Sequence, residues 1–500
     1  AGPKAASEWT PNPVGDIPAS FTWGNFNQTN FLGTTKNQHL PQFCNSSWAF
    51  ATTSALSDRI AVARGGVFPE IDLSPQLLLT CDSVDQGCRG GSALSAYTWM
   101  SQNNITDSSC APYQAKSWKE GLQCNAQAIC KECNPNGQCY VPSFFNNYRV
   151  NQYGSLPANN VQALQNEILA NGPIVCDIDA GPIINFQGTG IVSNPGTATN
   201  HSVSVVGWGV STDGQNTPYW IVRNSWGEYW GDNGYFKVLR GSNALLIESK
   251  CIYATPVNTW SKQVYPHTAK PSAPSAKANN INTFKELFKA MIQDKAPRMH
   301  KNCVQPTPKD AMQVIKSKLP HEMPMALPQS FWWGNVDGKN YLSWTVNQHL
   351  PQYCGSCWAQ GGSSSIADRA NILSGMTFPR IALAPQVLIN CGVGSCSNGG
   401  NTNAPFEFAY KHGIPEMGCQ VYQALDPPHA SCTPIQQCAN CAWNPDFTQN
   451  CWAVSSFTRW YVSEFGAVRG PDKMKKEIFA RGPISCQLMA TNALEKYTGG

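Results

Sequence analysis

The apolar and polar positions in the first half of the chain predict both strands and a helix. Residues 201–209 alternate as a β-strand does, and residues 219–223 form a second strand-like run just before Asn224. Residues 48–64 contain neither proline nor glycine and end at Gly65, where a Gly-Gly pair predicts a helix stop. No apolar run reaches the about 18 residues that a membrane-spanning helix needs, so we expect no membrane span.

Long stretches of the first half recur in the second half at a nearly constant distance. Cys486 follows Cys176 by 310 positions, and other matched pairs lie 308 to 312 positions apart. This indicates tandem duplication of a whole domain, which we place at 17–254 for repeat one and 327–500 for repeat two. Repeat one continues for 75 residues after Cys176, whereas only 14 residues follow Cys486. We therefore expect repeat two to be truncated and the natural chain to be longer.

Residues 255–326 connect the repeats. A stretch of Pro, Ala, Ser and Lys at 269–276 predicts an extended linker. Residues 283–295 then place apolar side chains at helical spacing and predict a short amphipathic helix.

Composition narrows the class of protein. Charged residues make up 13 % of the 500 residues and the net charge is +4, with Lys and Arg scattered, which does not favour binding to nucleic acid. The 21 cysteines and several Asn-x-Ser/Thr sequons favour an oxidising, secretory route, so we expect a secreted or lysosomal protein. Nothing in the composition indicates a cofactor. The candidate glycosylation sites are Asn27, Asn45, Asn104 and Asn200.

One short motif occurs in both repeats and differs at the decisive position. Repeat two reads Cys354-Gly-Ser-Cys357-Trp, whereas repeat one reads Cys44-Asn-Ser-Ser47-Trp. The motif of repeat two is the local signature around the nucleophile of papain and the cathepsins. The chain thus resembles two fused papain-like cysteine peptidases. The resemblance implies α+β domains, each with a helical lobe and a β-rich lobe around a cleft.

The resemblance assigns catalytic roles in repeat one. His201 matches the general base, Asn224 the residue that orients it, and Gln38 the side chain that stabilises the oxyanion. Ser47 stands where the nucleophilic thiol belongs. A serine hydroxyl is far less acidic than a thiol, so we expect repeat one to be an inactive pseudopeptidase whose cleft residues survive in part.

In repeat two the resemblance makes Cys357 the nucleophile and Gln348 the oxyanion donor. A thiol at the first turn of a helix beside an imidazole has a lowered pKa and ionises readily. The matching base and its orienting residue should lie about 310 positions after His201 and Asn224, which is beyond residue 500.

A three-residue insertion, His-Leu-Pro, lies between the glutamine and the nucleophile position of each repeat. It resembles the mini-loop of cathepsin Z (also called cathepsin X), a lysosomal carboxypeptidase. The resemblance implies that His39 and His349 bind the C-terminal carboxylate of the substrate, so that peptide or protein C-termini are trimmed. A cation or N–H donor there would favour a free carboxylate over an internal peptide bond. A loop histidine without a ligand is the alternative.

Disulfide pairing follows from the same resemblance. Repeat one would pair Cys44–Cys88, Cys81–Cys124, Cys110–Cys130, Cys133–Cys139 and Cys176–Cys251. Repeat two would pair Cys354–Cys396, Cys391–Cys432, Cys419–Cys438 and Cys441–Cys451. Cys486 is left without a partner. The Cys-x-x-Cys spacings at 130–133 and 438–441 would also suit zinc, although the disulfide pattern uses all these cysteines and we expect no metal.

Cys303 lies in the segment that corresponds to a propeptide. In cathepsin Z-like zymogens a propeptide cysteine bonds the catalytic cysteine, so the resemblance implies a Cys303–Cys357 zymogen lock that reduction would open. Repeat one lacks both halves of such a lock, because Ser47 replaces the nucleophile and no cysteine precedes Cys44.

Two function classes follow. The leading hypothesis is a secreted or lysosomal cysteine carboxypeptidase that works through repeat two. The alternative is a catalytically inactive, disulfide-rich structural or binding component of an extracellular or cell-surface assembly, with other subunits as partners.

Overall fold

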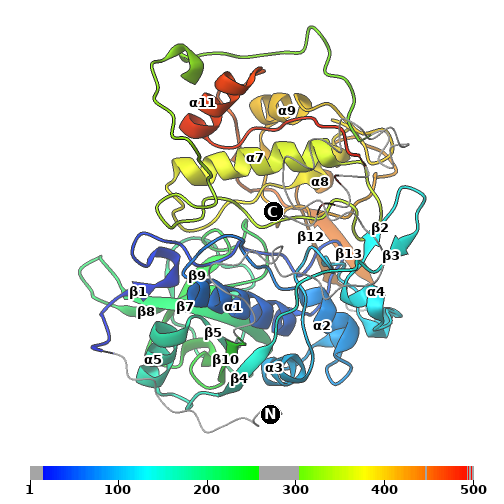
Figure 1. Ribbon diagram of the computed structural model, residues 1–500. Coiled ribbons are helices and arrows are strands. Elements are labelled where there is room, and N and C mark those ends of the chain that lie inside the picture. The colour runs from blue at the N-terminus through cyan, green and yellow to red at the C-terminus, as the bar shows by residue number, and fades with distance from the viewer. Residues whose placement is uncertain (1–14, 258–302, 445–447, 492–493, 495–496, 498–500) are drawn as a thin grey trace.

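The computed structural model describes residues 15–257, 303–444 and 448–491, together with residues 494 and 497. The two repeats lie side by side, repeat one in blue to green and repeat two in yellow to red (Figure 1). The helix predicted at 283–295 lies outside the described residues. In the part of the chain that is described, no helix is long and apolar enough to cross a membrane.

Repeat one has a helical lobe built around α1 (Ser47–Arg64), the helix that the sequence predicts at 48–64. It ends where Gly65 adopts φ 73°, and the N–H groups of Gly65 and Gly66 close the last turn. Most of α1 is buried, so its hydrophobic residues are not confined to one face. The other helices are α2 (Pro75–Cys81), α3 (Ala93–Gln102), α4 (Ala126–Ile129), η2 (Gly87–Arg89) and η3 (Trp118–Glu120), and a small hairpin joins β2 (Glu132–Cys133) to β3 (Cys139–Tyr140).

The second lobe of repeat one is a mixed sheet of eight strands. Its order is β4-β10-β5-β7-β8-β9-β6, with β1 on β7. Both predicted strands are present as neighbours, and Trp208 faces Trp220 across them. The strands are β1 (Phe21–Thr22), β4 (Val150–Ser155), β5 (Ile174–Ile178), β6 (Ile191–Val192), β7 (His201–Val210), β8 (Pro218–Arg223), β9 (Tyr235–Leu239) and β10 (Cys251–Pro256). Helix α5 (Val161–Asn171) and the short helices η1 (Trp23–Asn25), η4 (Gly181–Ile183) and η5 (Ala244–Leu246) complete this lobe.

Buried ion pairs fasten α1 to the sheet lobe. Arg59 on α1 lies 2.8 Å from Glu167 on α5 and also donates to three backbone carbonyl groups. Asp58, the residue before it, pairs with Arg223 at the end of β8 at 2.5 Å. Because every partner in these pairs is almost fully buried, the pairs fix the angle at which α1 presents its N-terminus to β7 and β8.

Repeat two repeats the helical lobe. Its main helix α7 (Cys357–Leu373) packs on α8 (Pro385–Asn390) and α9 (Ala404–His412) around a core that includes Trp358, Leu388 and Phe408. The sheets described in this repeat are two-stranded. The remaining elements are η7 (Pro320–Glu322), α10 (Pro434–Gln437), α11 (Pro471–Arg481), β11 (Ile414–Pro415), β12 (Ala439–Trp443), β13 (Gln449–Ala453) and β14 (Arg459–Trp460).

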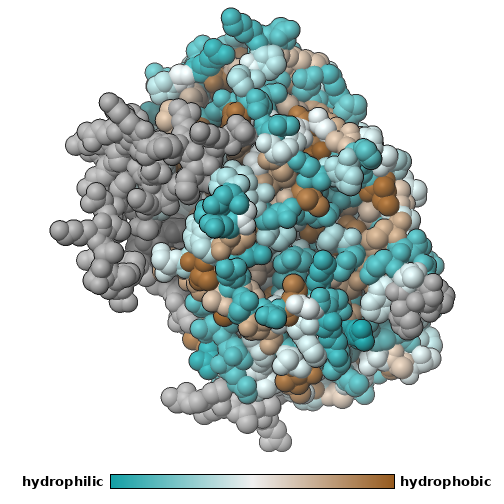
Figure 2. Space-filling model, turned by 90° about the vertical axis from the view of Figure 1, so that its right-hand side faces the viewer, coloured by the Kyte–Doolittle hydropathy of each residue, from teal (hydrophilic) through white to brown (hydrophobic). Residues whose placement is uncertain are grey.

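Ten disulfides join the cysteines in the pairs that the resemblance implied, and Cys486 is free and exposed. The cysteines of both Cys-x-x-Cys spacings are therefore in disulfides. No group of His, Cys, Asp and Glu within the described ranges could hold a metal ion. Figure 2 shows one face of the surface, on which apolar side chains are scattered among hydrophilic ones.

The two repeats contact each other through matching positions. Phe378 packs against Tyr235 of repeat one with ring centroids 4.4 Å apart, and its counterpart Phe68 contacts Trp332 of repeat two at 5.0 Å. Glu70 forms an ion pair with Arg380, which lies 310 positions later in the sequence. The contact is thus close to a two-fold arrangement in which each repeat offers the same surface to the other.

Candidate functional site

The cleft of repeat one brings together residues from three distant parts of the chain. Ser47 begins α1, His201 begins β7, and Asn224 follows β8. His201 Nε2 lies 2.7 Å from Asn224 Oδ1, and Ser47 Oγ accepts a hydrogen bond of 3.2 Å from the N–H of Ser202. The structure therefore places the expected nucleophile position beside the strand that carries the expected base.

Electrostatics in this cleft favour uncharged groups. Burial lowers the pKa of His201 to about 4, and the hydrogen bond that His201 donates to Asn224 Oδ1 opposes that change only in part. His201 is thus a neutral imidazole at pH 5 and above. An active cysteine site would hold a thiolate next to an imidazolium, but Ser47 offers no anion to keep the proton on His201.

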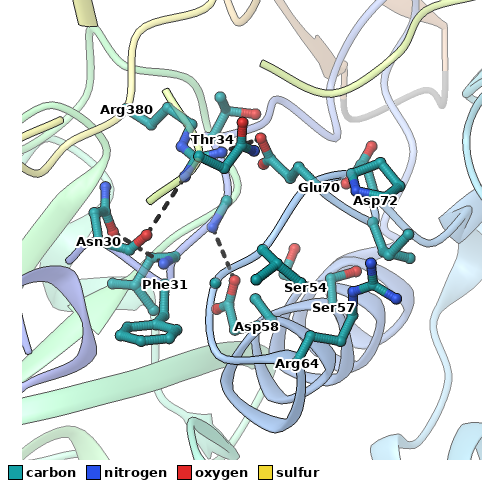
Figure 3. Close-up of a pocket in the computed structure, with 18 of the residues that line it drawn as sticks. Asn30, Phe31, Thr34, Ser54, Ser57, Asp58, Arg64, Glu70, Asp72 and Arg380 are labelled. Atoms are coloured by element: carbon teal, nitrogen blue, oxygen red, sulfur yellow. Dashed lines mark hydrogen bonds and ion pairs between the residues drawn. The ribbon is translucent and has the colours of Figure 1, made fainter. Parts of the chain in front are cut away.

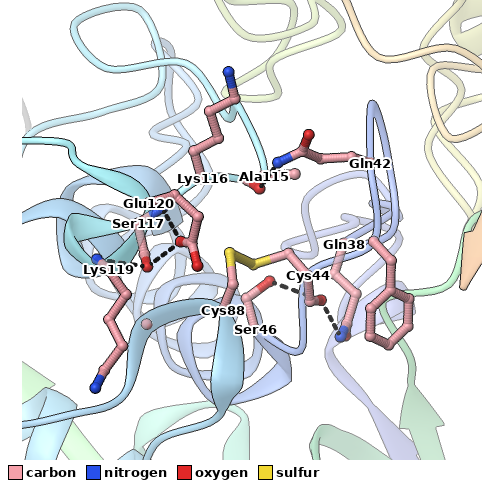
Figure 4. Close-up of a disulfide and its surroundings, with 12 residues drawn as sticks. Gln38, Gln42, Cys44, Ser46, Cys88, Ala115, Lys116, Ser117, Lys119 and Glu120 are labelled. Atoms are coloured by element: carbon pink, nitrogen blue, oxygen red, sulfur yellow. Dashed lines mark hydrogen bonds between the residues drawn. A yellow bond between two sulfur atoms is a disulfide. The ribbon is translucent and has the colours of Figure 1, made fainter. Parts of the chain in front are cut away.

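Gln38 is held by the loop that leads into α1. Its Nε2 donates to the carbonyl oxygen of Cys44 at 3.1 Å, and its Oε1 accepts from Ser225 Oγ at 2.7 Å. Figure 4 shows this amide next to the Cys44–Cys88 disulfide, with Ser46 beside it. The expected oxyanion donor is therefore held between Ser225 and the loop that precedes Ser47, and one of its N–H groups is already used by the protein itself.

In repeat two the nucleophile position is covalently occupied. Cys357 at the start of α7 is bonded to Cys303, and the N–H of Cys357 donates to Cys303 Sγ at 3.0 Å. Gln348 Nε2 lies 3.7 Å from the same sulfur. The three residues that were expected to form the lock and its oxyanion donor are thus in direct contact.

The segment that carries Cys303 forms a single parallel β-bridge, between Val304 and Gly400. The N–H of Gly400 donates to the carbonyl of Cys303, and the N–H of Gln305 donates to the carbonyl of Gly400, at 3.2 and 2.8 Å. A side chain at Gly400 would place its Cβ 2.5 Å from the ring of Trp358. Glycine therefore lets this backbone lie close to the indole and pair with an extended segment.

The two mini-loop histidines have the same local geometry. His39 stacks on Phe43 and His349 stacks on Tyr353, each with ring centroids 4.7 Å apart and planes inclined by 27°. Burial, followed by the charge of His201, lowers the pKa of His39 to about 3, although the nearby Asn440 side chain favours the protonated ring. His39 is therefore a neutral ring, which can donate or accept a hydrogen bond but offers no positive charge.

His349 differs because it meets a carboxylate. Its Nδ1 lies 2.9 Å from Glu132 Oε1 of repeat one, and its Nε2 lies 3.0 Å from Gln348 Nε2. Glu132, the partner of His349, and Asn440, which lies near His39, both come from the opposite repeat. The sequence could not predict these neighbours, because nothing in either repeat alone shows which loops of the two domains meet.

Two tyrosines were also missed. Tyr113 donates to the carbonyl of Gln38 at 2.6 Å, and Tyr422 donates to the carbonyl of Gln348 at 2.7 Å. They fix the backbone next to each mini-loop. The two tyrosines lie 309 positions apart, close to the spacing of the repeats, and this recurrence could have marked them in the sequence as a matched pair.

Of the candidate glycosylation sites, Asn27, Asn104 and Asn200 are exposed, and Asn45 is half-buried beside the cleft of repeat one. A glycan at Asn45 would lie next to Ser47.

A pocket between the repeats lies away from both nucleophile positions. Arg380 of repeat two enters it, pairs with Glu70 and donates to the carbonyl of Asn30 at 3.4 Å (Figure 3). Asp58 lines the same pocket and accepts from the N–H of Gly33 at 2.9 Å. Asp58 is paired with Arg223 and Glu70 with Arg380, so the pocket is a polar part of the contact between the repeats.

Comparison with known proteins gives one family. The sequence pattern of the papain family of cysteine proteases matches residues 17–255 and 327–500. Cathepsin Z of Onchocerca volvulus is 35 % identical over 250 residues, which cover 48 % of this chain and 79 % of that protein. Cathepsin B-like cysteine proteinase 5 of Caenorhabditis elegans is 30 % identical over 235 residues, covering 43 % of this chain and 67 % of that protein.

Among solved structures, digestive procathepsin L 3 of Tenebrio molitor larval midgut is 27 % identical with a TM-score of 0.39, covering 48 % of this chain and 71 % of that chain. The two cathepsin relatives from Onchocerca volvulus and Caenorhabditis elegans each cover somewhat less than half of the chain, about the length of one repeat, and the family pattern itself occurs twice. The chain therefore belongs to the papain family of cysteine proteases, with two α+β domains of that family in tandem.

Proposed function

We propose that this protein is a cysteine carboxypeptidase of cathepsin Z type that acts through repeat two and is held inactive by a disulfide. The observation that supports the proposal is the Cys303–Cys357 bond at the N-terminus of α7. It puts the expected nucleophile under a segment that pairs with Gly400 as an extended ligand would.

Release requires thiol–disulfide exchange. A thiolate from a reductant attacks Cys303 Sγ, the bond between the two sulfurs breaks, and Cys357 leaves as a thiolate. The positive end of the α7 dipole stabilises that thiolate. It can then attack the carbonyl carbon of the last peptide bond. The nitrogen of the C-terminal residue takes a proton from the imidazolium that the family resemblance leads us to expect beside Cys357 and leaves as an amine, and water hydrolyses the thioester that remains.

The choice of the last peptide bond is assigned to His349. An N–H donor or cation at this end of the cleft stabilises the free carboxylate of a peptide or protein C-terminus. An internal segment of a substrate has no carboxylate to offer at this position.

Repeat one is proposed to be a pseudopeptidase. The neutral His201 and the hydroxyl of Ser47 lack the charge separation that makes a cysteine site nucleophilic. The disulfides and the exposed sequons support a secretory route, which leads to the lysosome or the cell exterior.

Labelling of the full natural chain with a thiol-reactive epoxide, with and without mild reductant, tests the proposal. Peptide mapping separates Cys357 from the free, exposed Cys486, which serves as an internal control for unactivated thiol. We expect Cys357 to be labelled only after reduction and far faster than Cys486. Labelling of Cys357 no faster than Cys486 after reduction would mean that the thiol is not activated, and the chain would then be a non-catalytic component of an extracellular assembly.

A further inference from the structure

The β2–β3 hairpin of repeat one lies against the mini-loop of repeat two. Both oxygens of the Glu132 carboxylate are bound there. His349 Nδ1 lies 2.9 Å from Oε1, and Asn347 Nδ2 donates to Oε2 at 2.8 Å. We call Asn347 and His349 the carboxylate cradle.

The cradle is built by the mini-loop itself. The backbone N–H of His349 donates to Asn347 Oδ1 at 2.9 Å, which turns the amide NH₂ group outward, and the stack on Tyr353 fixes the imidazole. Repeat one has the same local bond, from the N–H of His39 to Asn37 Oδ1 at 2.9 Å. Because the geometry is present in both repeats, it does not depend on the carboxylate that fills one of them.

The occupants of the two mini-loops differ in charge. The uncharged Asn440, which precedes Cys441, is the residue of the opposite hairpin near His39, where Nδ1 has no hydrogen-bond partner, whereas Glu132, which precedes the matching Cys133, binds His349 Nδ1. Asn37 Nδ2 donates to the carbonyl of Gly418 instead of a carboxylate. A carboxylate is thus supplied only to the repeat that carries the cysteine nucleophile.

Glu132 is ionised in this position. Burial works against ionisation, but the hydrogen bonds from His349 and Asn347 outweigh it and lower the pKa of Glu132. Its side chain remains 26 % exposed and that of His349 16 % exposed. The carboxylate can therefore return to water when another carboxylate replaces it.

We propose that the Asn347–His349 cradle is a receptor for a carboxylate, and that Glu132 fills it as an internal stand-in for the C-terminal carboxylate of a substrate. This rests on the proposed function of His349. Repeat one is then an inhibitor within the same chain, which competes with peptide C-termini for the catalytic repeat. A substrate with a free C-terminus has to displace Glu132, and Asn347 is the second donor that recognises it.

Binding and turnover are measured separately on the full natural chain. For binding, Cys357→Ala removes both the lock and the chemistry, and titration calorimetry measures the affinity for an N-acetylated dipeptide with a free C-terminus. We expect Glu132→Gln to bind it about tenfold more tightly, since the competing anion is gone. The amide-ended dipeptide should bind equally to both proteins.

Asn440→Gln is the matched control, because it changes the corresponding residue of the other hairpin, and it should leave both affinities unchanged. In the reduced protein with Cys357 intact, Glu132→Gln should lower KM for the free-carboxylate peptide by about the same factor. Glu132→Asn copies Asn440, the residue at the corresponding position of the other hairpin. It should also lower KM for the free-carboxylate peptide.

Unchanged or weaker binding of the free-carboxylate dipeptide by Glu132→Gln would overturn the inference, and a fall in affinity would show that Glu132 positions His349 instead of competing with the ligand. If the dipeptide binds as expected but no variant turns over substrate, the cradle stands and the proposed peptidase function fails. If turnover occurs and Glu132→Gln changes neither KM nor affinity, the function stands and the inference fails.

Discussion

Two carboxyl groups from different repeats meet in the inter-repeat contact, and we expect them to make stability depend on pH. Glu416 of repeat two is 7 % exposed, and its Oε1 accepts a hydrogen bond of 2.9 Å from Trp460 Nε1. Burial raises the pKa of Glu416 to about 7. Burial, followed by the charge of Glu416, raises the pKa of Glu228 of repeat one well above its ordinary value.

The sign and size of the effect follow from proton linkage. In the unfolded chain Glu416 titrates near 4.5, whereas in the folded protein it keeps its proton to about pH 7. The folded state therefore binds more protons between these values, and the free energy of unfolding falls as pH rises from 4.5 to 7. A rise in pKa from 4.5 to about 7 corresponds to about 3 kcal/mol at about 1.4 kcal/mol for each pH unit.

Urea unfolding at pH 4.5 and pH 8, with disulfides intact, measures this term. We expect Glu416→Gln to match the wild-type free energy of unfolding at pH 4.5, where the wild-type carboxyl is mostly protonated, and to exceed it by up to about 3 kcal/mol at pH 8. Glu407→Gln is the control, because that side chain is exposed in an ion pair with Lys411 and should give a small effect. An advantage of Glu416→Gln that is equal at both pH values would refute the argument.

Three further changes test other parts of the structure. Arg380→Glu should destabilise the protein by about 3–5 kcal/mol, because it leaves Glu70 facing a like charge, and adding Glu70→Arg should recover most of the loss in urea unfolding. Arg59→Leu should cost about 3–5 kcal/mol by stranding a buried carboxylate, and the matching Arg369→Leu, whose side chain is 26 % exposed, clearly less. In the Ser47→Cys variant we expect the epoxide to label position 47, where the parent protein has no thiol. Failure to label this position would show that the cleft of repeat one cannot activate a thiol.

The sequence predicted the parts of the fold that depend on local pattern. The helix after the nucleophile position lies where the absence of proline and glycine and the stop at Gly65 indicated. The strands that begin at His201 and end before Asn224 lie where the strand-like runs indicated. Each of these elements is fixed by its own side chains and stops. Comparison with a known family added the disulfide pairs, which spacing alone leaves open. The roles of the catalytic residues stay predictions, because proximity of Ser47, His201 and Asn224 is compatible with an inert site.

What the sequence could not supply is the contact between the repeats. Glu132 is one of many acidic residues, and only the folded hairpin places it at His349 of the other domain. This contact arises from long-range packing, which has no periodic signal in the chain.

Fusion of the repeats explains how such a contact can be asymmetric at matching positions. In a dimer of identical copies, a residue on the two-fold axis meets itself, so an acidic or basic side chain there would face a like charge. Glu70 and Arg380 are 310 positions apart and hold the same place in their repeats, yet they form an ion pair. Glu132 and Asn440 differ in the same way at the two mini-loops. A single chain lets each repeat change its half of the interface independently, so matching positions can carry residues of different charge.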